Sequence, residues 1–257
     1  MISRIEAVVL KTIPFRETSI IATLCTREYG KMSVVAKGAR GPKGKMSAAL
    51  QPMNLVTAVV YRNEQRDLHL VSECDILRPL KNMTSDLDKM GAGLAVVELT
   101  SAATHGSEEH AGLYSLVCAA LETIDGATKR PQNALYFFEH RLLTLLGFAP
   151  DLHRCPRCGL DLSGAPDHRR TFLDTGSGVL CGDCSAVGVG LAQVSIQALR
   201  VLQFLQDTKD IRGVSNLEMS TAVESEVAAA LRRSLQRHVE GLGRLKSEDV
   251  FAAIRNS

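Results

Sequence analysis

The 257-residue sequence has no tryptophan and few other aromatic residues, with four tyrosines and seven phenylalanines. It has no apolar run near the ~18 residues that a membrane-spanning helix needs. Charge within residues 1–6 excludes the apolar core of a signal peptide. Internal repeats and low-complexity tracts are also missing. We therefore expect a soluble, cytoplasmic protein without membrane contact, long enough for two or three packed units.

Motifs for nucleotide hydrolysis and for common catalytic centres are missing too. A P-loop needs four residues between its first glycine and the Gly-Lys pair, then Ser or Thr. Here five residues separate Gly38 from Gly44, and Met46 occupies the hydroxyl position. No G-x-S-x-G occurs, and the acid pairs at 86/88 and 108/109 suit helix starts, where acids favour the helix dipole. We expect no enzymatic activity.

The seven cysteines are odd in number, which argues against a disulfide framework and fits a reducing cytosol. Four of them form two C-x2-C pairs, Cys155/Cys158 and Cys181/Cys184, with 22 residues between the pairs. Two such turns can present four thiolates to one tetrahedral zinc ion. No coordination position is then left for water, so the zinc would be structural. A redox dithiol is the alternative, but it needs one pair and a βαβ setting that is absent here.

The remaining cysteines, Cys25, Cys74 and Cys118, lie in apolar stretches and are expected to fill the core. His153 stands two residues before Cys155 and could replace a ligand, although a solvated loop position is the favoured interpretation.

Residues 1–80 contain five short runs rich in β-branched residues. Pro14, Gly30, the stretch 38–44 and Asn63 separate them as turn signals. The expected strands are 5–10, 19–24, 32–35, 55–61 and 68–72. Five strands in ~80 residues favour a closed barrel of the OB type, which leaves no exposed edge. An open five-stranded meander is the alternative.

After residue 80, apolar residues recur at helical spacing. Ser85 is the expected N-cap of the first helix, and Gly106 its expected stop. The later helices are expected at about 113–126, 131–147, 195–205 and 220–240. The segment 151–190 interrupts them and contains a short hairpin between the cysteine pairs. So short a segment buries little core, so the metal would supply folding free energy.

These patterns predict an α+β fold with two domains, residues 1–80 and 81–257. The second would be helical and would carry the zinc-binding insertion at about 151–190.

The net charge of +2 is unevenly distributed, because residues 1–80 hold 12 Lys and Arg against 7 Asp and Glu. The stretch 37–45 combines cations and glycines without an acid, and this combination suits close approach to phosphates. A solvated flexible loop is the alternative. We expect phosphate contacts from Lys37, Arg40, Lys43 and Lys45. Weaker candidates on the same barrel are Lys11, Arg16, Arg27 and Lys31.

The mode of binding follows from the small number of rings. Phe15, Tyr29 and Tyr61 are the aromatic residues of the first 80. Barrels that hold single strands tightly stack bases on several rings. Binding should therefore depend on phosphates, with little sequence preference and strong salt dependence.

Two stretches are specific enough to indicate a family. The first extends from Ala7 to Pro52 and includes Ala36-Lys-Gly-Ala-Arg40, and the second is 138–150, FEHRLLTLLGFAP, which runs into the first cysteine pair. With the order of strands, basic loop, helices and cysteine segment, they make the chain resemble the RecO family of bacterial recombination mediators over nearly its whole length.

The resemblance implies an OB-fold barrel, a helical domain with zinc, and binding of single- and double-stranded DNA. It further implies annealing of complementary strands and, with RecR, help for RecA in replacing single-strand-binding protein (SSB). Some members lack the cysteines, so zinc would be a scaffold. A nucleoid-associated location would follow.

The resemblance also implies a contact of the helical domain with the C-terminal tail of SSB. An acidic, hydrophobic tail would suit a groove between helices with a cation at its rim, and Arg130 and Arg141 are candidates. Two other classes remain open, a zinc-containing protein adaptor without DNA binding and a zinc-ribbon enzyme of nucleotide metabolism. The missing catalytic cluster counts against the enzyme.

Overall fold

The computed structural model describes residues 1–41, 46–63, 65–104, 112–166, 171–185, 191–243, 245 and 247. The chain forms two compact units, one built on residues 1–135 with the described residues from 242 onward, and one on residues 136–241. Within the described ranges, no helix is long and apolar enough to cross a membrane.

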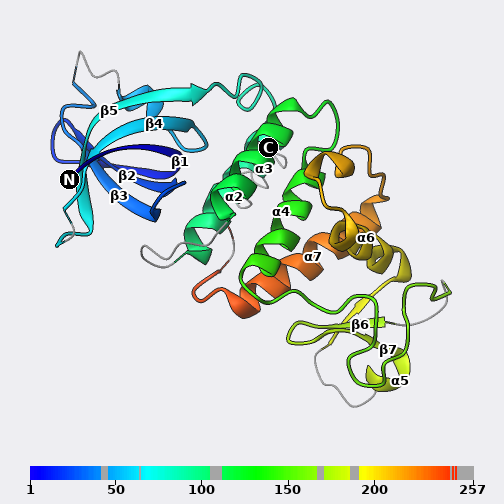
Figure 1. The fold of residues 1–257 in the computed structure, drawn as a ribbon. Coiled ribbons are helices and arrows are strands. Elements are labelled where there is room, and N and C mark those ends of the chain that lie inside the picture. The colour runs from blue at the N-terminus through cyan, green and yellow to red at the C-terminus, as the bar shows by residue number, and fades with distance from the viewer. Residues whose placement is uncertain are drawn as a thin grey trace. The chain divides into compact units, whose positions relative to one another are not determined.

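The first unit begins with a closed barrel of five strands, drawn from blue to cyan in Figure 1. The strands are β1 (Ile2–Phe15), β2 (Ser19–Thr26), β3 (Gly30–Ala36), β4 (Leu55–Tyr61) and β5 (Leu68–Arg78), with the short helix α1 (Met46–Ala49) between β3 and β4. Around the barrel the order is β1-β2-β3-β5-β4, and β4 pairs with β1 to close it. The pairing of β3 with β5 is parallel, and the other four are antiparallel. The α+β class with a closed barrel is confirmed, and the open meander was wrong.

Alternate residues of each strand fill the barrel, as the period of two in a strand requires. Ile5, Ala7 and Val9 of β1 point inward with Leu24 of β2 and Val34 of β3 into one core cluster. Each is at most 1% exposed. Small and β-branched side chains dominate this core, which fits the narrow interior of a five-stranded barrel.

Strand β1 is longer than expected and contains Pro14, which the sequence had indicated as a turn. Pro14 pairs with Ile20 of β2, whereas the pairing of β1 with β4 covers residues 2–8. At Pro14, β1 thus has a partner strand on the β2 side but none on the β4 side. The missing N–H of the proline therefore leaves no hydrogen bond unmade on the β4 side, and the proline is tolerated. A bulge between Val9 and Lys11 bends the strand before this point.

Two helices complete the first unit, α2 (Leu87–Ala103), which packs on β1 and β2, and α3 (Leu113–Gly126), which packs on α2 and β1. Asp86 caps α2 in place of the expected Ser85, because its carboxylate accepts the N–H groups of Asp88 and Lys89 at 2.8 and 3.2 Å. The expected stop at Gly106 lies outside the described residues.

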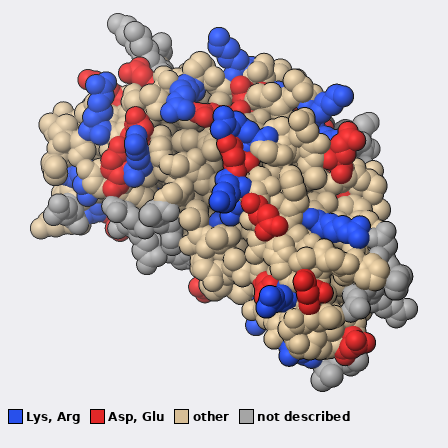
Figure 2. Space-filling model, turned by 45° about the vertical axis from the view of Figure 1, so that its right-hand side comes forward, with Lys and Arg blue, Asp and Glu red and all other residues tan. Residues whose placement is uncertain are grey.

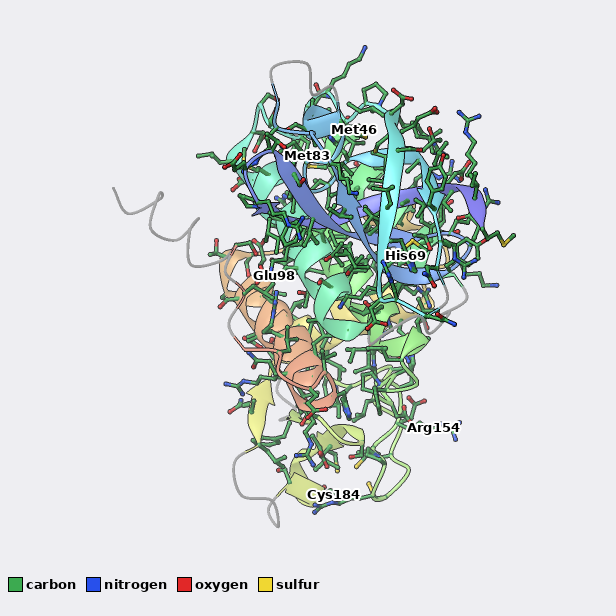
Figure 3. All side chains as sticks on the ribbon, turned by 90° about the vertical axis from the view of Figure 1, so that its left-hand side faces the viewer. Met46, His69, Met83, Glu98, Arg154 and Cys184 are labelled. Carbon is green, nitrogen blue, oxygen red and sulfur yellow. The ribbon has the colours of Figure 1, made fainter. Side chains whose placement is uncertain are left out.

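Close packing of α2 depends on Gly93. A Cβ atom there would stand 2.7 Å from the sulfur of Met53 and 2.9 Å from that of Met83, and Figure 3 labels Met83 beside the barrel. Met53 itself has φ +73° and is 9% exposed. The loop before β4 thus presses a methionine against α2 at a backbone conformation that few side chains adopt.

Helix α4 (Gln132–Leu145) contains the division between the two units. The second unit continues with β6 (Thr171–Asp174), β7 (Gly178–Cys181), α5 (Gly182–Ser185), β8 (Ala192–Val194), α6 (Ile196–Asp207), the 3-10 helix η1 (Ile211–Val214) and α7 (Thr221–His238). Its three strands form one small sheet in the order β7-β6-β8. The expected hairpin and the late helices are present. The expected domain boundary after residue 80 stays a prediction.

The helices of the second unit are joined by a buried ion pair. Glu139 of α4 is 1% exposed and accepts from Arg232 of α7 at 2.7 Å. Nearby, the Tyr136 hydroxyl donates to Glu224 at 3.1 Å. A buried pair of this kind fixes the register of two packed helices more than it adds stability.

Candidate functional site

The four paired cysteines meet in the second unit. Their sulfur atoms all lie within 4.8 Å of one another, and those of Cys158 and Cys181 are 3.7 Å apart. Cys155 and Cys181 are buried, Cys184 is half-buried and Cys158 is exposed. Figure 3 labels Cys184 in the short α5, one turn after β7 ends. The cluster could hold one four-coordinate metal ion.

The first cysteine pair sits on a tight turn that the backbone defines. The Gly159 N–H donates to the Cys155 carbonyl at 2.8 Å, and the Cys155 N–H donates to the Leu160 carbonyl at 2.9 Å. Gly159 has φ +72°, where glycine is favoured. Arg157 reaches across to the Cys184 carbonyl at 2.8 Å and so joins the two turns.

The surroundings of Cys155 favour a thiolate. Burial raises the pKa of this thiol, but the backbone N–H groups of Cys181, Cys158 and Arg157 point at the sulfur and together lower it to about 6. Donors of this kind are typical of metal-binding turns, in which the thiolate is the ligand.

The turn is attached to the β6–β7 hairpin through Gly178. This residue has φ +130° and forms a β-bridge with Asp151. The Val179 N–H donates to the Asp151 carbonyl at 2.9 Å, while the Asp151 carboxylate accepts the N–H groups of His153 and Arg154. The hairpin therefore positions the chain that enters the first cysteine pair.

His153 is not part of the cysteine cluster. Its two ring nitrogens contact the Ser163 hydroxyl at 3.2 Å and the Asp207 carboxylate at 3.1 Å. The histidine thus connects the cysteine-bearing loop to the end of α6.

At one end of the barrel, the β1–β2 turn lies against the chain that follows β3. The Arg40 N–H donates to the Thr18 carbonyl at 2.9 Å. The Arg40 guanidinium donates to the carbonyls of Arg16 and Glu17, both at 2.6 Å. Three expected phosphate contacts, Arg16, Lys37 and Arg40, are therefore exposed at the same end. Lys43 and Lys45 lie outside the described residues.

The weaker candidates are spread over the barrel. Arg27 lies in the β2–β3 turn at the opposite end, 64% exposed and 3.1 Å from Glu6. The Lys31 ammonium caps α2 through the carbonyls of Ser101 and Thr104 at 2.6 and 3.0 Å. Lys11 is exposed on β1. Burial, followed by the charge of Lys11, lowers the pKa of Lys31.

Charge on the surface is mixed. On the face drawn in Figure 2, blue Lys and Arg side chains alternate with red Asp and Glu side chains. On this face, local groups of cations therefore matter more for a polyanion than a broad positive field.

Arg141 of α4 is half-buried. Its guanidinium donates to the carbonyls of Gln206 and Thr208 at the end of α6 and lies 5.1 Å from the ring of Phe137. Arg130 is exposed just before α4 and has φ +50°. The contact with an SSB tail stays a prediction for both arginines.

Several contacts lie beyond what sequence patterns can indicate. Arg62, at the end of β4, places its guanidinium 3.7 Å from the ring centroid of Tyr29. Phe148 stacks on His238 with ring centroids 4.1 Å apart. Each pair joins residues far apart in the sequence, and no local spacing signals it.

Two family models cover most of the chain. The model described as "Recombination protein O N terminal" matches residues 1–80, and "Recombination protein O C terminal" matches residues 84–249. The division between them falls where the strands give way to helices.

Curated relatives match over nearly their full lengths. The chain is 30% identical over 255 residues to the "DNA repair protein RecO" of Chloroherpeton thalassium, covering 98% of both chains. It is 30% identical over 259 residues to that of Chlorobaculum parvum, covering 99% of both. The protein of the same name from Salinibacter ruber is 32% identical over 264 residues, covering 100% of this chain and 95% of its own.

RecO is not a known family of enzymes, which agrees with the missing catalytic motifs. The five-stranded barrel lies within the residues that the first model matches, and the four-cysteine cluster lies between helices within those that the second matches. The chain therefore belongs to the RecO family of DNA repair and recombination proteins.

Proposed function

We propose that this protein binds single- and double-stranded DNA through one end of its barrel and anneals complementary strands without ATP. The observation that carries the proposal is the juxtaposition of Arg16, Lys37 and Arg40 at that end. Annealing forms no covalent bond, so it needs lowered phosphate repulsion and two strands held together. Cations that contact phosphates without reading bases can provide both.

Arg40 has two roles in this proposal. Its guanidinium holds the β1–β2 turn through two carbonyl oxygens, which fixes the position of Arg16. The remaining donors of this exposed guanidinium can still meet a phosphate. Lys37 carries no such structural bond among the described contacts, so it is the cleaner position for a test.

The binding experiment compares two charge reversals on the same barrel, Lys37→Glu and Arg66→Glu. Arg66 is exposed in the β4–β5 loop, at the end opposite Lys37, so its variant is the matched control. Each lost phosphate contact should make the slope of log K against log salt shallower by ~0.7 on single strands. We expect this change and weaker binding for Lys37→Glu alone, regardless of base sequence.

Equal affinities and slopes for wild type and Lys37→Glu would remove this end of the barrel from the interface. Absence of DNA binding by the wild type would instead support an adaptor that contacts proteins only.

We further propose that the protein acts with RecR to help RecA replace SSB on single strands. This step needs a contact with SSB besides DNA, and an acidic tail would seek a cation beside an apolar surface. Arg130, exposed just before α4, and Arg141 of α4 are the candidates for this cation. Complementary strands coated with full-length SSB should anneal faster than the same strands coated with SSB that lacks its tail. Equal rates on both coats would exclude tail docking.

We propose zinc as the metal of the cysteine cluster. Sulfurs at ~2.3 Å from a tetrahedral zinc ion stand ~3.8 Å apart, and the 3.7 Å between Cys158 and Cys181 fits this spacing. Four thiolates favour zinc over magnesium or calcium, which prefer oxygen. With no place left for water, the ion would hold the two turns together and take no part in DNA chemistry.

A further inference from the structure

A stacked ring pair lies in the second unit, outside the cysteine cluster. The rings of Phe148 and His238 have centroids 4.1 Å apart and planes 10° apart. Phe148 is 42% exposed. Because His238 covers one face of this ring, the exposure belongs to the opposite face and the edge. Part of this aromatic ring is therefore open to solvent.

Both rings are held by the backbone around them. Gly147, with φ +82°, ends α4, and the Phe148 N–H then donates to the Leu143 carbonyl at 2.8 Å. His238 Nε2 lies 2.7 Å from the Thr175 carbonyl of the β6–β7 hairpin. A carbonyl oxygen only accepts, so this nitrogen carries the proton and the imidazole plane is fixed. Figure 1 shows the ends of α4 and α7 and the hairpin in this region.

One exposed arginine, Arg237, directly precedes His238 in α7. Asp174, beside Thr175, has its pKa lowered by the Gly176 N–H and the Ser177 hydroxyl, and then by the charges of Arg157 and Arg237. Of these two arginines, Arg157 reaches the Cys184 carbonyl in the cysteine cluster, whereas Arg237 is the neighbour of His238 in the chain. The Arg237 side chain is exposed, so its guanidinium is open to a ligand at this end of α7.

We propose that Phe148 and His238 form a platform on which one base of a single-stranded nucleic acid stacks, with Arg237, the residue before His238, available to an adjoining phosphate. The platform is a second contact besides the barrel, and it rests on the proposed DNA binding. Stacking on a ring is available to every base but not to bases already stacked within a duplex. The platform therefore adds affinity for single strands without sequence preference.

The arrangement is already formed before a strand arrives. A ring that must be ordered on binding loses part of its stacking free energy to conformational entropy. Phe148 is spared this loss because His238 and the hydrogen bond to Leu143 hold it in place. This is why an exposed phenylalanine at this position can act as a platform and not only as the edge of a core.

The test replaces Phe148 with Leu, which keeps an apolar side chain but removes the ring, and with Tyr, which keeps the ring. Phe204→Leu is the matched control, because Phe204 is similarly exposed, at 41%, on α6. The probes are a short oligothymidylate, an abasic strand of equal length and a duplex. Zinc content and thermal unfolding of each variant verify that the fold is kept.

We expect Phe148→Leu to bind oligothymidylate roughly tenfold more weakly than wild type, near the lower end of stacking contributions per base. Affinities for the abasic strand and the duplex should stay as in wild type. Phe148→Tyr and Phe204→Leu should bind all three probes like wild type. A strand with 2-aminopurine should be quenched less by Phe148→Leu than by wild type.

Equal loss on base-bearing and abasic strands would show that Phe148 acts through the fold, and the platform would be wrong. The platform would also be wrong if Phe148→Leu bound oligothymidylate as tightly as wild type. If Lys37→Glu bound DNA more weakly in the same experiment, the proposed barrel interface would still stand. If Phe148→Leu lost only the binding of an acidic, phenylalanine-containing peptide, the ring pair would be a protein-docking site instead.

Discussion

At the scale of single residues, Gly178 decides whether the cysteine-bearing loop can lie on its hairpin. A Cβ atom at this position would stand 2.2 Å from the Asp151 carbonyl oxygen, and the backbone has φ +130°. Gly178→Ala should therefore lower the free energy of unfolding by roughly 3 kcal/mol, as clashes in fixed backbone do. Urea unfolding measures the loss.

Gly176→Ala is the control for this prediction, because its Cβ would meet the Asp174 carboxylate at an ordinary 3.5 Å. It should unfold within about 0.5 kcal/mol of wild type. Similar stabilities for the two alanine variants would mean that the bridge between Gly178 and Asp151 does not hold the loop.

His140 predicts how stability depends on pH. It is 1% exposed, and its ring nitrogens have no hydrogen-bond partner in the part of the chain that the structure describes. Burial and the Arg141 charge lower its pKa from 6.5 to about 4, against a smaller opposite effect of Asp207. The folded state thus binds a proton at His140 less readily than the unfolded state does. Above pH 6.5 the ring is neutral in both states, so its protonation does not lower the free energy of unfolding. Roughly 3 kcal/mol should be lost as pH falls from 6.5 towards 4.

His140→Leu should remove this part of the acid sensitivity. The measurement is urea unfolding of both proteins at several pH values, taken as the difference between them, so that metal loss at low pH cancels. Parallel pH profiles of the variant and wild type would contradict a neutral buried histidine.

At the scale of elements, the cysteine segment should depend on its metal. Besides the aliphatic residues that it buries, Leu152, Leu162, Leu173, Val179 and Leu180, a bound zinc ion would contribute folding free energy where the two cysteine turns meet. Cys181→Ser should release zinc and speed hydrogen exchange in β6, β7 and α5, while the barrel stays protected. Cys118→Ala, which removes a thiol outside the cluster, should keep one zinc per chain by atomic emission. Full zinc content in Cys181→Ser would refute the ligand assignment.

The elements themselves were largely predictable, because their signals are local. Alternation and turn residues indicated five strands, and the starts of α3 and α6 followed from apolar spacing. The structure adds that Ser195 caps α6, because its hydroxyl accepts from the Ala198 N–H at 3.2 Å. Closure of the barrel needs β1 to meet β4, a pairing between distant residues that no window of sequence contains. Pro14 was expected to mark a turn because the sequence does not show that β1 lacks a β4 partner at this residue.

The candidate sites likewise divide into those with a local sequence pattern and those that depend on residues far apart in the sequence. The spacing of the cysteines is a local pattern, and it predicted a cluster that the structure brings together. The basic residues were chosen by charge alone, and charge does not reveal partners. The carbonyls that hold Lys31 belong to α2, and the turn that Arg40 organises belongs to another part of the barrel. Such partners become visible only when distant segments are placed.

At the scale of the whole molecule, the chain combines a barrel unit and a helical unit that are joined within α4. The barrel carries grouped cations at one end and few rings. The helical unit carries the cysteine cluster and the exposed ring pair. In our proposals, the first unit contacts phosphates, the second stacks a base, and a metal in the cysteine cluster would be a scaffold.

The central claim is that the barrel end promotes annealing without nucleotide. The most direct measurement is the rate at which two complementary strands pair in the presence of wild type, Lys37→Glu or Arg66→Glu, with no ATP added. The account predicts fast annealing by wild type and by Arg66→Glu, and slow annealing by Lys37→Glu that recovers little at low salt. Annealing by Lys37→Glu at the wild-type rate, or none by wild type without ATP, would contradict it.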